Sequence, residues 1–223
     1  MGESTSGASG PGARDRTVVH LMRHGEVHNP TGVLYGRLDG FHLSELGREM
    51  AELVARHLAT NDITHVVASP LERAQETAAP IAAGHDVKVV TDDRVIESAN
   101  RFEGSAVGAR DLLHPRNWHL FRDVRTPSWG EPYEEIATRM LAAIADARTA
   151  ARGHEAVVVS HQLPVWTVRN KLVGHRLWHD PRRRECTLAS LTSLTFEGDD
   201  LASVAYSEPA VSLLARASRS VGA

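Results

Sequence analysis

Short apolar runs alternate with longer amphipathic stretches along most of the chain. The runs are rich in Val, as is typical of buried strands, whereas apolar side chains between them recur at helical spacing. The expected strands cover 17–22, 65–69, 87–90 and 155–160, and the expected helices begin after Ser44, run from Ser69 to about Ala83, cover 133–152, and extend from about Pro164 to Val173. Ser44 can cap the first helix, and the segment from Ser69 to Glu72 has the form of a capping box for the second.

Strands that alternate with helices predict an α/β fold. We expect three layers (α/β/α), in which a mostly parallel central sheet carries helices on both faces. Two further segments, 186–196 and 201–206, are expected to be edge strands joined by a turn from Glu197 to Asp200. Cys186 is expected to fill space on the first of these strands.

Length and composition favour one domain. The chain has 223 residues, which is enough to bury one sizeable core. We expect 1–16 to be a disordered leader rich in Gly, Ser and Ala, 17–208 to form a single domain, and 209–223 to be a C-terminal tail. Residues 98–132 are too long for an ordinary connection, so we expect them to contain short helices and to act as a lid inserted in the domain.

Charge and cysteine content argue against several partners. The formal net charge is -3, from 25 Lys plus Arg and 28 Asp plus Glu, which gives no reason to expect nucleic acid or an anionic membrane as partner. No apolar run is long enough to span a bilayer, and the N-terminus lacks the apolar core of a signal peptide. Cys186 is the single cysteine, so no internal disulfide can form. We therefore expect a cytoplasmic protein.

Polar side chains follow three of the expected strands. Arg23 and His24 follow the first, the segment from Ser69 to Arg73 follows the second, and His161 follows the fourth. Because ligands of such sheets bind outside the carboxyl ends of the strands, these side chains are expected to converge there. Two arginines can grip a phosphate through forked hydrogen bonds, and a helix N-terminus beside Arg73 also favours an anion.

A cationic pocket with a central imidazole suits phosphoryl transfer through nitrogen. Nearby arginines disfavour protonation of His24, and a neutral imidazole can attack phosphorus. Arg23, Arg73, Asn29 and His161 are expected to hold the charge on the equatorial oxygens. An acid must protonate the leaving oxygen, and water then hydrolyses the phosphohistidine. Side chains supply the positive charge, so we expect no metal and no other cofactor; His175 and His179, four residues apart, lack a carboxylate partner at motif spacing.

Three segments together resemble the histidine phosphatase superfamily, the group that includes phosphoglycerate mutases and acid phosphatases. They are Arg23-His24-Gly25-Glu26 with Asn29 downstream, the segment from Ser69 to Ala78, and Ser160-His161. The loop from Tyr35 to Gly47 is also similar, and the resemblance spans about Val18 to Leu172. It implies the family's fold and its phosphohistidine chemistry. It also implies that Glu97 is the proton donor, with Glu103 as the competing acid.

The chain departs from the family pattern in ways that leave the substrate open. Gln162 stands where the family usually has Gly, the segment from Asn100 to Gly104 lacks the usual first glycine, and Glu76 replaces a frequent Gln. We expect the substrate, a small phosphorylated metabolite, to contact the loop and strand-end residues of the site. They are Arg23, Asn29, Arg37, Arg73, His161 and Gln162.

Three functions are compatible with these residues. The resemblance favours a metal-independent phosphomonoester hydrolase in which His24 is the nucleophile. A phosphoglycerate mutase is the alternative, although the lid is short and departs from the expected mutase pattern. A phospho-ligand-binding protein without activity is a third reading, and the presence of all core groups argues against it. Exposed edge strands and lid surfaces leave a homodimer open.

Overall fold

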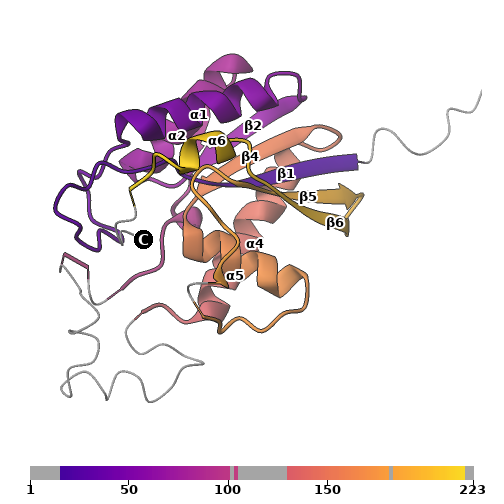
Figure 1. Cartoon of the computed structure of the whole chain (residues 1–223). Coiled ribbons are helices and arrows are strands. Elements are labelled where there is room, and N and C mark those ends of the chain that lie inside the picture. The colour runs from indigo at the N-terminus through magenta and orange to yellow at the C-terminus, as the bar shows by residue number, and fades with distance from the viewer. Residues whose placement is uncertain (1–15, 101–102, 105–129, 181–182, 219–223) are drawn as a thin grey trace, which may run out of the picture.

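The computed structural model describes residues 16–100, 103–104, 130–180 and 183–218. Nearly all of the expected leader and most of the expected lid therefore lie outside the described residues. The described part contains the strand–helix alternation that the sequence predicts, and Figure 1 shows its central sheet between two groups of helices.

The described strands form one six-stranded sheet in the order β3-β2-β4-β1-β5-β6. Their bounds are Arg16–Arg23 (β1), Ile63–Ala68 (β2), Val89–Thr91 (β3), Glu155–Ser160 (β4), Leu191–Glu197 (β5) and Asp200–Ser207 (β6). The first four are mutually parallel, and β5 and β6 add an antiparallel hairpin beside β1. The predicted α/β fold with a mostly parallel sheet is confirmed.

Both faces of the sheet are buried by helices. The helices are α1 (Glu45–Leu58), α2 (Glu72–Gly84), α4 (Tyr133–Ala150), α5 (Gln162–Leu172) and α6 (Val211–Leu214), with a 3-10 turn η1 at Asp93–Val95. Successive strand side chains point to opposite faces, so Leu21 packs in the core under α4 and α5 while Met22 packs in the core under α1 and α2. This double burial explains why the parallel strands are almost continuously apolar.

Three local expectations are wrong. Only β6 of the C-terminal hairpin is an edge strand, because β5 pairs with β1 on its other side, and Cys186 precedes β5 instead of lying on it. Ser44 does cap α1, accepting a hydrogen bond from the Gly47 amide (2.9 Å). In contrast, α2 begins at Glu72 after Leu71, with no side-chain cap, because Ser69 hydrogen-bonds to a histidine at the end of β4.

The chain after β6 returns to the face that α1 covers. Leu213 and Leu214 of α6 pack against the core beneath α1 and α2. Arg216 forms an ion pair with Glu49 of α1 (2.6 Å), and the Ser218 amide donates to a Glu26 carboxylate oxygen (2.6 Å). Residues expected to be a tail thus contact the loop that follows β1.

Two glycines allow that loop to meet α1 backbone to backbone. A Cβ on Gly25 would lie 2.6 Å from the carbonyl oxygen of Gly47, and a Cβ on Gly47 would lie 2.0 Å from the carbonyl oxygen of Glu26. Neither neighbour can move without shifting the loop or the helix. The absence of side chains at 25 and 47 therefore sets where the chain runs after β1.

We predict that Gly47→Ala destabilises the protein although Ala is the better helix former. Overpacking against the Glu26 carbonyl should lower the free energy of unfolding by about 1–3 kcal/mol, measured by urea denaturation. Gly84→Ala, at the open end of α2 with no atom within 4 Å of the added Cβ, is the control. It should leave stability unchanged or raise it by less than about 1 kcal/mol. Equal effects of the two substitutions would contradict the contact.

Candidate active site

The carboxyl ends of β1, β2 and β4 bring His24, Ser69 and His161 together, as the sequence predicts. Backbone hydrogen bonds extend the sheet past the strand ends: the His24 amide donates to the Ser160 carbonyl (3.1 Å) and the Ser69 amide to the Val159 carbonyl (3.0 Å). The ring centroids of His24 and His161 lie 5.1 Å apart. The imidazoles are therefore placed by the sheet itself.

His24 has one ring nitrogen occupied and one free. Its Nδ1 lies 2.7 Å from the Gly25 carbonyl oxygen, which can only accept, so Nδ1 carries the proton and Nε2 keeps its lone pair. Nε2 is buried and has no hydrogen-bond partner among the described residues. Burial, with the positive charges of Arg73 and Arg23, lowers the pKa of His24 well below its usual value. The ring is thus neutral, with its lone pair available at Nε2.

Arg23 and Arg73 present unused N–H donors beside this ring. Arg73 is fully buried; one of its terminal nitrogens donates to the Gly36 carbonyl (2.5 Å), while Nε and the other terminal nitrogen have no hydrogen-bond partner among the described residues. Arg23 donates to the Cys186 carbonyl (2.8 Å), and its Nε likewise has no partner in the described part of the chain. Within the described ranges neither forms an ion pair. One buried and one half-buried cation, without a counterion among the described residues, make this a strong anion site.

His161 contributes a second oriented imidazole. Its Nε2 lies 2.8 Å from Ser69 Oγ, and its Nδ1 is buried without a partner in the part of the chain that the structure describes. Burial, followed by the effect of His24 and of nearby arginines, lowers its pKa well below the usual value. Ser69, which was expected both at this edge and as a helix cap, bonds to His161 and does not cap α2. Nothing in the local sequence distinguishes these two roles.

Glu97 is a buried carboxyl with one free oxygen. Its Oε1 accepts from the Ser98 amide (2.8 Å), whereas Oε2 has no partner among the described residues. Burial raises the pKa of Glu97, and the charges of Arg73, Arg184 and Arg23 oppose this in part. Glu103 is only half-buried, and its carboxylate accepts from the Asn100 amide (3.0 Å). The two candidate acids thus differ in environment, and only Glu97 is fully enclosed.

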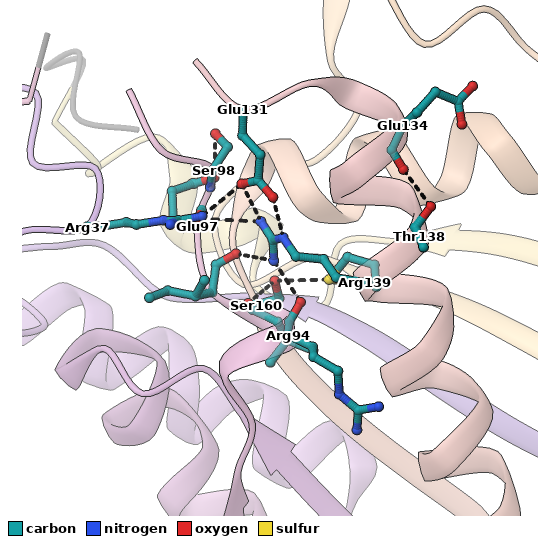
Figure 2. A network of polar contacts seen from close by, with 12 residues as sticks. Arg37, Arg94, Glu97, Ser98, Glu131, Glu134, Thr138, Arg139 and Ser160 are labelled. Carbon is teal, nitrogen blue, oxygen red and sulfur yellow. Dashed lines mark hydrogen bonds and ion pairs between the residues drawn. The ribbon is translucent and has the colours of Figure 1, made fainter. Parts of the chain in front are cut away.

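Two arginines hold the backbone of Glu97 in place, and Figure 2 shows how Glu131 bridges them. Arg37 Nε donates to the Glu97 carbonyl (2.6 Å), and its guanidinium pairs with Glu131 (2.8 Å). Arg139 of α4 also pairs with Glu131 (2.7 Å) and donates to the carbonyls of Arg94 and Ile96 (2.7 Å each). This network of charged hydrogen bonds fixes the segment that carries the Glu97 carboxyl.

The remaining predicted contacts are engaged within the protein. Asn29 forms two hydrogen bonds with the Val33 backbone, donating to its carbonyl (2.9 Å) and accepting from its amide (3.3 Å). Gln162 donates to the Cys186 carbonyl (3.2 Å). Substrate contact by Asn29, Arg37 and Gln162 stays a prediction.

Sequence reasoning missed Arg184. This half-buried residue donates from Nε to His179 Nε2 (2.8 Å) and from a terminal nitrogen to Gln162 Oε1 (3.3 Å). It lies in a run of three arginines ahead of β5, where no periodic pattern separates a surface arginine from a buried one. Arg184 lies more than ten residues after the end of α5. Its position near the site therefore depends on how the segment between α5 and β5 folds.

Two properties of the described residues concern metal binding and membranes. No group of three or more His, Cys, Asp or Glu side chains in this part of the chain is placed to hold a metal ion. None of the described helices has both the length and the apolarity to cross a membrane. His179, considered above as a metal ligand, bonds instead to the Leu177 carbonyl (2.6 Å) and to Arg184.

Comparison with known proteins confirms the predicted family. The model of the histidine phosphatase superfamily (branch 1) matches residues 19–209. An uncharacterised protein of Mycobacterium tuberculosis, Rv0525, is 62% identical over 198 residues, which cover 88% of this chain and 98% of that protein. A probable phosphoglycerate mutase of Yersinia pestis, GpmB, is 31% identical over 180 residues, covering 77% of this chain and 82% of the relative.

Solved structures agree on the fold. The mycobacterial glucosyl-3-phosphoglycerate phosphatase Rv2419c superposes with a TM-score of 0.69 at 24% identity, over 86% of this chain and 96% of that protein. At this identity the likeness concerns the fold alone.

We predict that Arg139→Ala destabilises the protein strongly. It leaves the Glu131 carboxylate, only 12% exposed, with fewer donors and frees the backbone carbonyls of 94 and 96. The free energy of unfolding should fall by about 3 kcal/mol in urea denaturation. Arg152→Ala removes an exposed pair with Asp199 and should cost less than about 1 kcal/mol. If the free energy of unfolding fell by the same small amount in both variants, the network would stabilise the protein no more than an exposed ion pair does.

Proposed function

The chain belongs to the histidine phosphatase superfamily, and from this premise we propose that it hydrolyses phosphate monoesters through a phosphohistidine at Nε2 of His24. The observation that carries the proposal is the free, buried Nε2 beside two arginines that have no counterion among the residues the structure describes. We propose a small phosphorylated metabolite as substrate and no metal, because Arg23 and Arg73 supply the positive charge that a metal would otherwise provide.

In the first step His24 Nε2 forms a bond to phosphorus as the bond from phosphorus to the ester oxygen breaks. Arg23 and Arg73 neutralise the transferring oxygens through the N–H groups that are otherwise unpaired. If the Ser69 hydroxyl donates to Nε2 of His161, Nδ1 of that ring carries a proton and can donate to the same oxygens. The protonated carboxyl of Glu97 gives its proton to the leaving alkoxide.

In the second step water attacks the phosphohistidine. The Glu97 carboxylate takes the proton from that water as the new bond from oxygen to phosphorus forms and the bond from nitrogen to phosphorus breaks. Inorganic phosphate leaves, and His24 and Glu97 return to their starting protonation states. One carboxyl thus serves as acid and then as base.

The opposite pKa shifts of His24 and Glu97 make this chemistry feasible at one pH. With the ordinary values of 6.5 and 4.5, a neutral imidazole would need a pH above 6.5 and a protonated carboxyl a pH below 4.5. Burial lowers the pKa of the imidazole and raises that of the carboxyl, so the two required states coexist over a wider range. The same lack of water produces both shifts.

A phosphoglycerate mutase is the second candidate, because GpmB, a probable mutase by name, is among the relatives. The same His24 chemistry would serve, but the phosphohistidine must return its phosphoryl group before water arrives. Assays on 3-phosphoglycerate with and without bisphosphoglycerate separate the two: a hydrolase releases phosphate without the bisphosphate, and a mutase forms 2-phosphoglycerate only with it. A phospho-ligand-binding protein without activity would give neither product.

We predict that His24→Ala lowers kcat/KM for p-nitrophenyl phosphate by on the order of 10⁴-fold or more, since the attacking atom is lost. His57→Ala, on the exposed face of α1, is the control and should stay within about twofold of the wild type. Phosphate release is measured at saturating and low substrate. Equal rates in the wild type and His24→Ala would remove His24 as the nucleophile.

The effect of Glu97→Gln should be largest for substrates with poor leaving groups and on the basic side of the pH profile. The acid works only below the raised pKa of Glu97, so wild-type kcat/KM should fall as pH rises through that value. Glu97→Gln should lower kcat/KM for an alkyl phosphate by about 10²–10⁴-fold, less for p-nitrophenyl phosphate, and remove the basic limb. Glu103→Gln should keep the limb and the rate; if it instead loses both, Glu103 is the acid.

A further inference from the structure

Arg184 is held rigidly by two neutral acceptors. His179 Nδ1 bonds to the Leu177 carbonyl (2.6 Å), so this nitrogen carries the ring proton and Nε2 is left to accept from Arg184 Nε (2.8 Å). Gln162 Oε1 accepts from a terminal nitrogen of the same guanidinium (3.3 Å). The ring of His179 itself contacts two aromatic rings, since its centroid lies 5.8 Å from that of Tyr133 and 5.8 Å from that of Trp166. The guanidinium therefore has a fixed orientation.

This guanidinium forms no ion pair in the part of the chain that the structure describes. No carboxylate within the described ranges forms an ion pair with Arg184, and its other terminal nitrogen has no hydrogen bond to a described residue. In contrast, Arg169 of α5 pairs with Glu185 at 2.9 Å. Removing a charge from water without a counterion is costly, so an oriented and unpaired guanidinium is expected where a ligand supplies the anion.

Arg184 lies beside the proposed phosphate site. Gln162 Nε2 and an Arg23 terminal nitrogen donate to one and the same acceptor, the Cys186 carbonyl, at 3.2 and 2.8 Å. The other end of the Gln162 amide accepts from Arg184, so one side chain links the two arginines. A glycine at position 162 could supply neither hydrogen bond. The positive charge of Arg184 also favours the ionised form of Glu97. Its effect is smaller than that of Arg73 and larger than that of Arg23.

We propose that Arg184, oriented by Gln162 and His179, binds a second anionic group of the substrate. The preferred substrates are then phosphate monoesters that also carry a carboxylate or a second phosphate a few bonds from the ester oxygen. Arg23 and Arg73 take the reacting phosphoryl group, and Arg184 takes the other anion. This inference rests on the proposed function for the identity of the phosphate site, but it concerns affinity and not the chemical step.

The test compares two ligands that differ in one group. 3-Phosphoglycerate carries a carboxylate where glycerol 3-phosphate carries a hydroxymethyl group. Their dissociation constants are measured by calorimetry on the full chain with His24→Ala, so that neither ligand is turned over. Because hydrogen bonds to charged groups contribute about 1.5–3 kcal/mol, the carboxylate should bind roughly ten- to hundredfold more tightly. Adding Arg184→Gln should reduce that preference to about threefold or less.

Matched variants separate this role from the other possibilities. Arg183→Gln removes the same charge from the neighbouring, exposed residue and should keep the full preference. Arg184→Lys should keep part of it. Binding of both ligands with equal affinity, binding of neither, or an unchanged preference in Arg184→Gln would overturn the proposal. A preference that disappears in Arg184→Gln, while both ligands still bind and Arg183→Gln keeps the preference, would support it.

Discussion

The hydrogen bond from His24 Nδ1 to the Gly25 carbonyl is the interaction on which the site depends. It fixes which nitrogen of the ring carries the proton and turns the lone pair of Nε2 toward the interior. With the tautomer reversed, the attacking nitrogen would be a donor, and Arg23 and Arg73 would face an N–H group. The course of the chain after β1 places the Gly25 carbonyl beside the ring. This course requires glycine at position 25, because a Cβ there would clash with α1.

The arginines of the site differ in whether the fold places a carboxylate beside them. Arg23 and Arg73 have no carboxylate partner among the described residues, whereas Arg37 and Arg139 share Glu131 and use their other donors on backbone carbonyls. The first pair is therefore left for an anionic ligand, and the second pair stabilises the segment of Glu97. The buried carboxyl stays outside both arrangements, which keeps its Oε2 free. Separate roles for similar side chains thus follow from which acceptors the fold places nearby.

Much of the fold and of the central site could be predicted from the sequence because both follow from strand patterning. Apolar runs locate β1, β2 and β4, and the polar residues directly after them, His24, Ser69 and His161, must meet at one edge of a parallel sheet. The position of β5 could not be predicted, since an amphipathic hairpin fits an edge or an interior place equally well. Glu97 came from the family resemblance alone.

Roles that depend on tertiary contacts could not be predicted from the sequence. The place of Ser69 at the sheet edge could be predicted, but its hydrogen bond to His161 could not, because its sequence environment is the same when it caps a helix. Arg184 looks like its exposed neighbour Arg183 until the segment before β5 is folded against α5. Glu131 and Arg139 carry no motif, and their link to Arg37 joins positions that are 94 residues apart. Such roles depend on acceptors that distant segments provide.

Locating the phosphorus in the trapped intermediate tests the central claim most directly. Protein labelled with ¹⁵N at histidine is mixed with a phosphate monoester, quenched in alkali to preserve the phosphoramidate, and examined by ³¹P and ¹⁵N NMR. The account predicts phosphorus bonded to Nε2 of His24. Phosphorus on Nδ1 of that ring, on another residue, or on no residue during active turnover would contradict it.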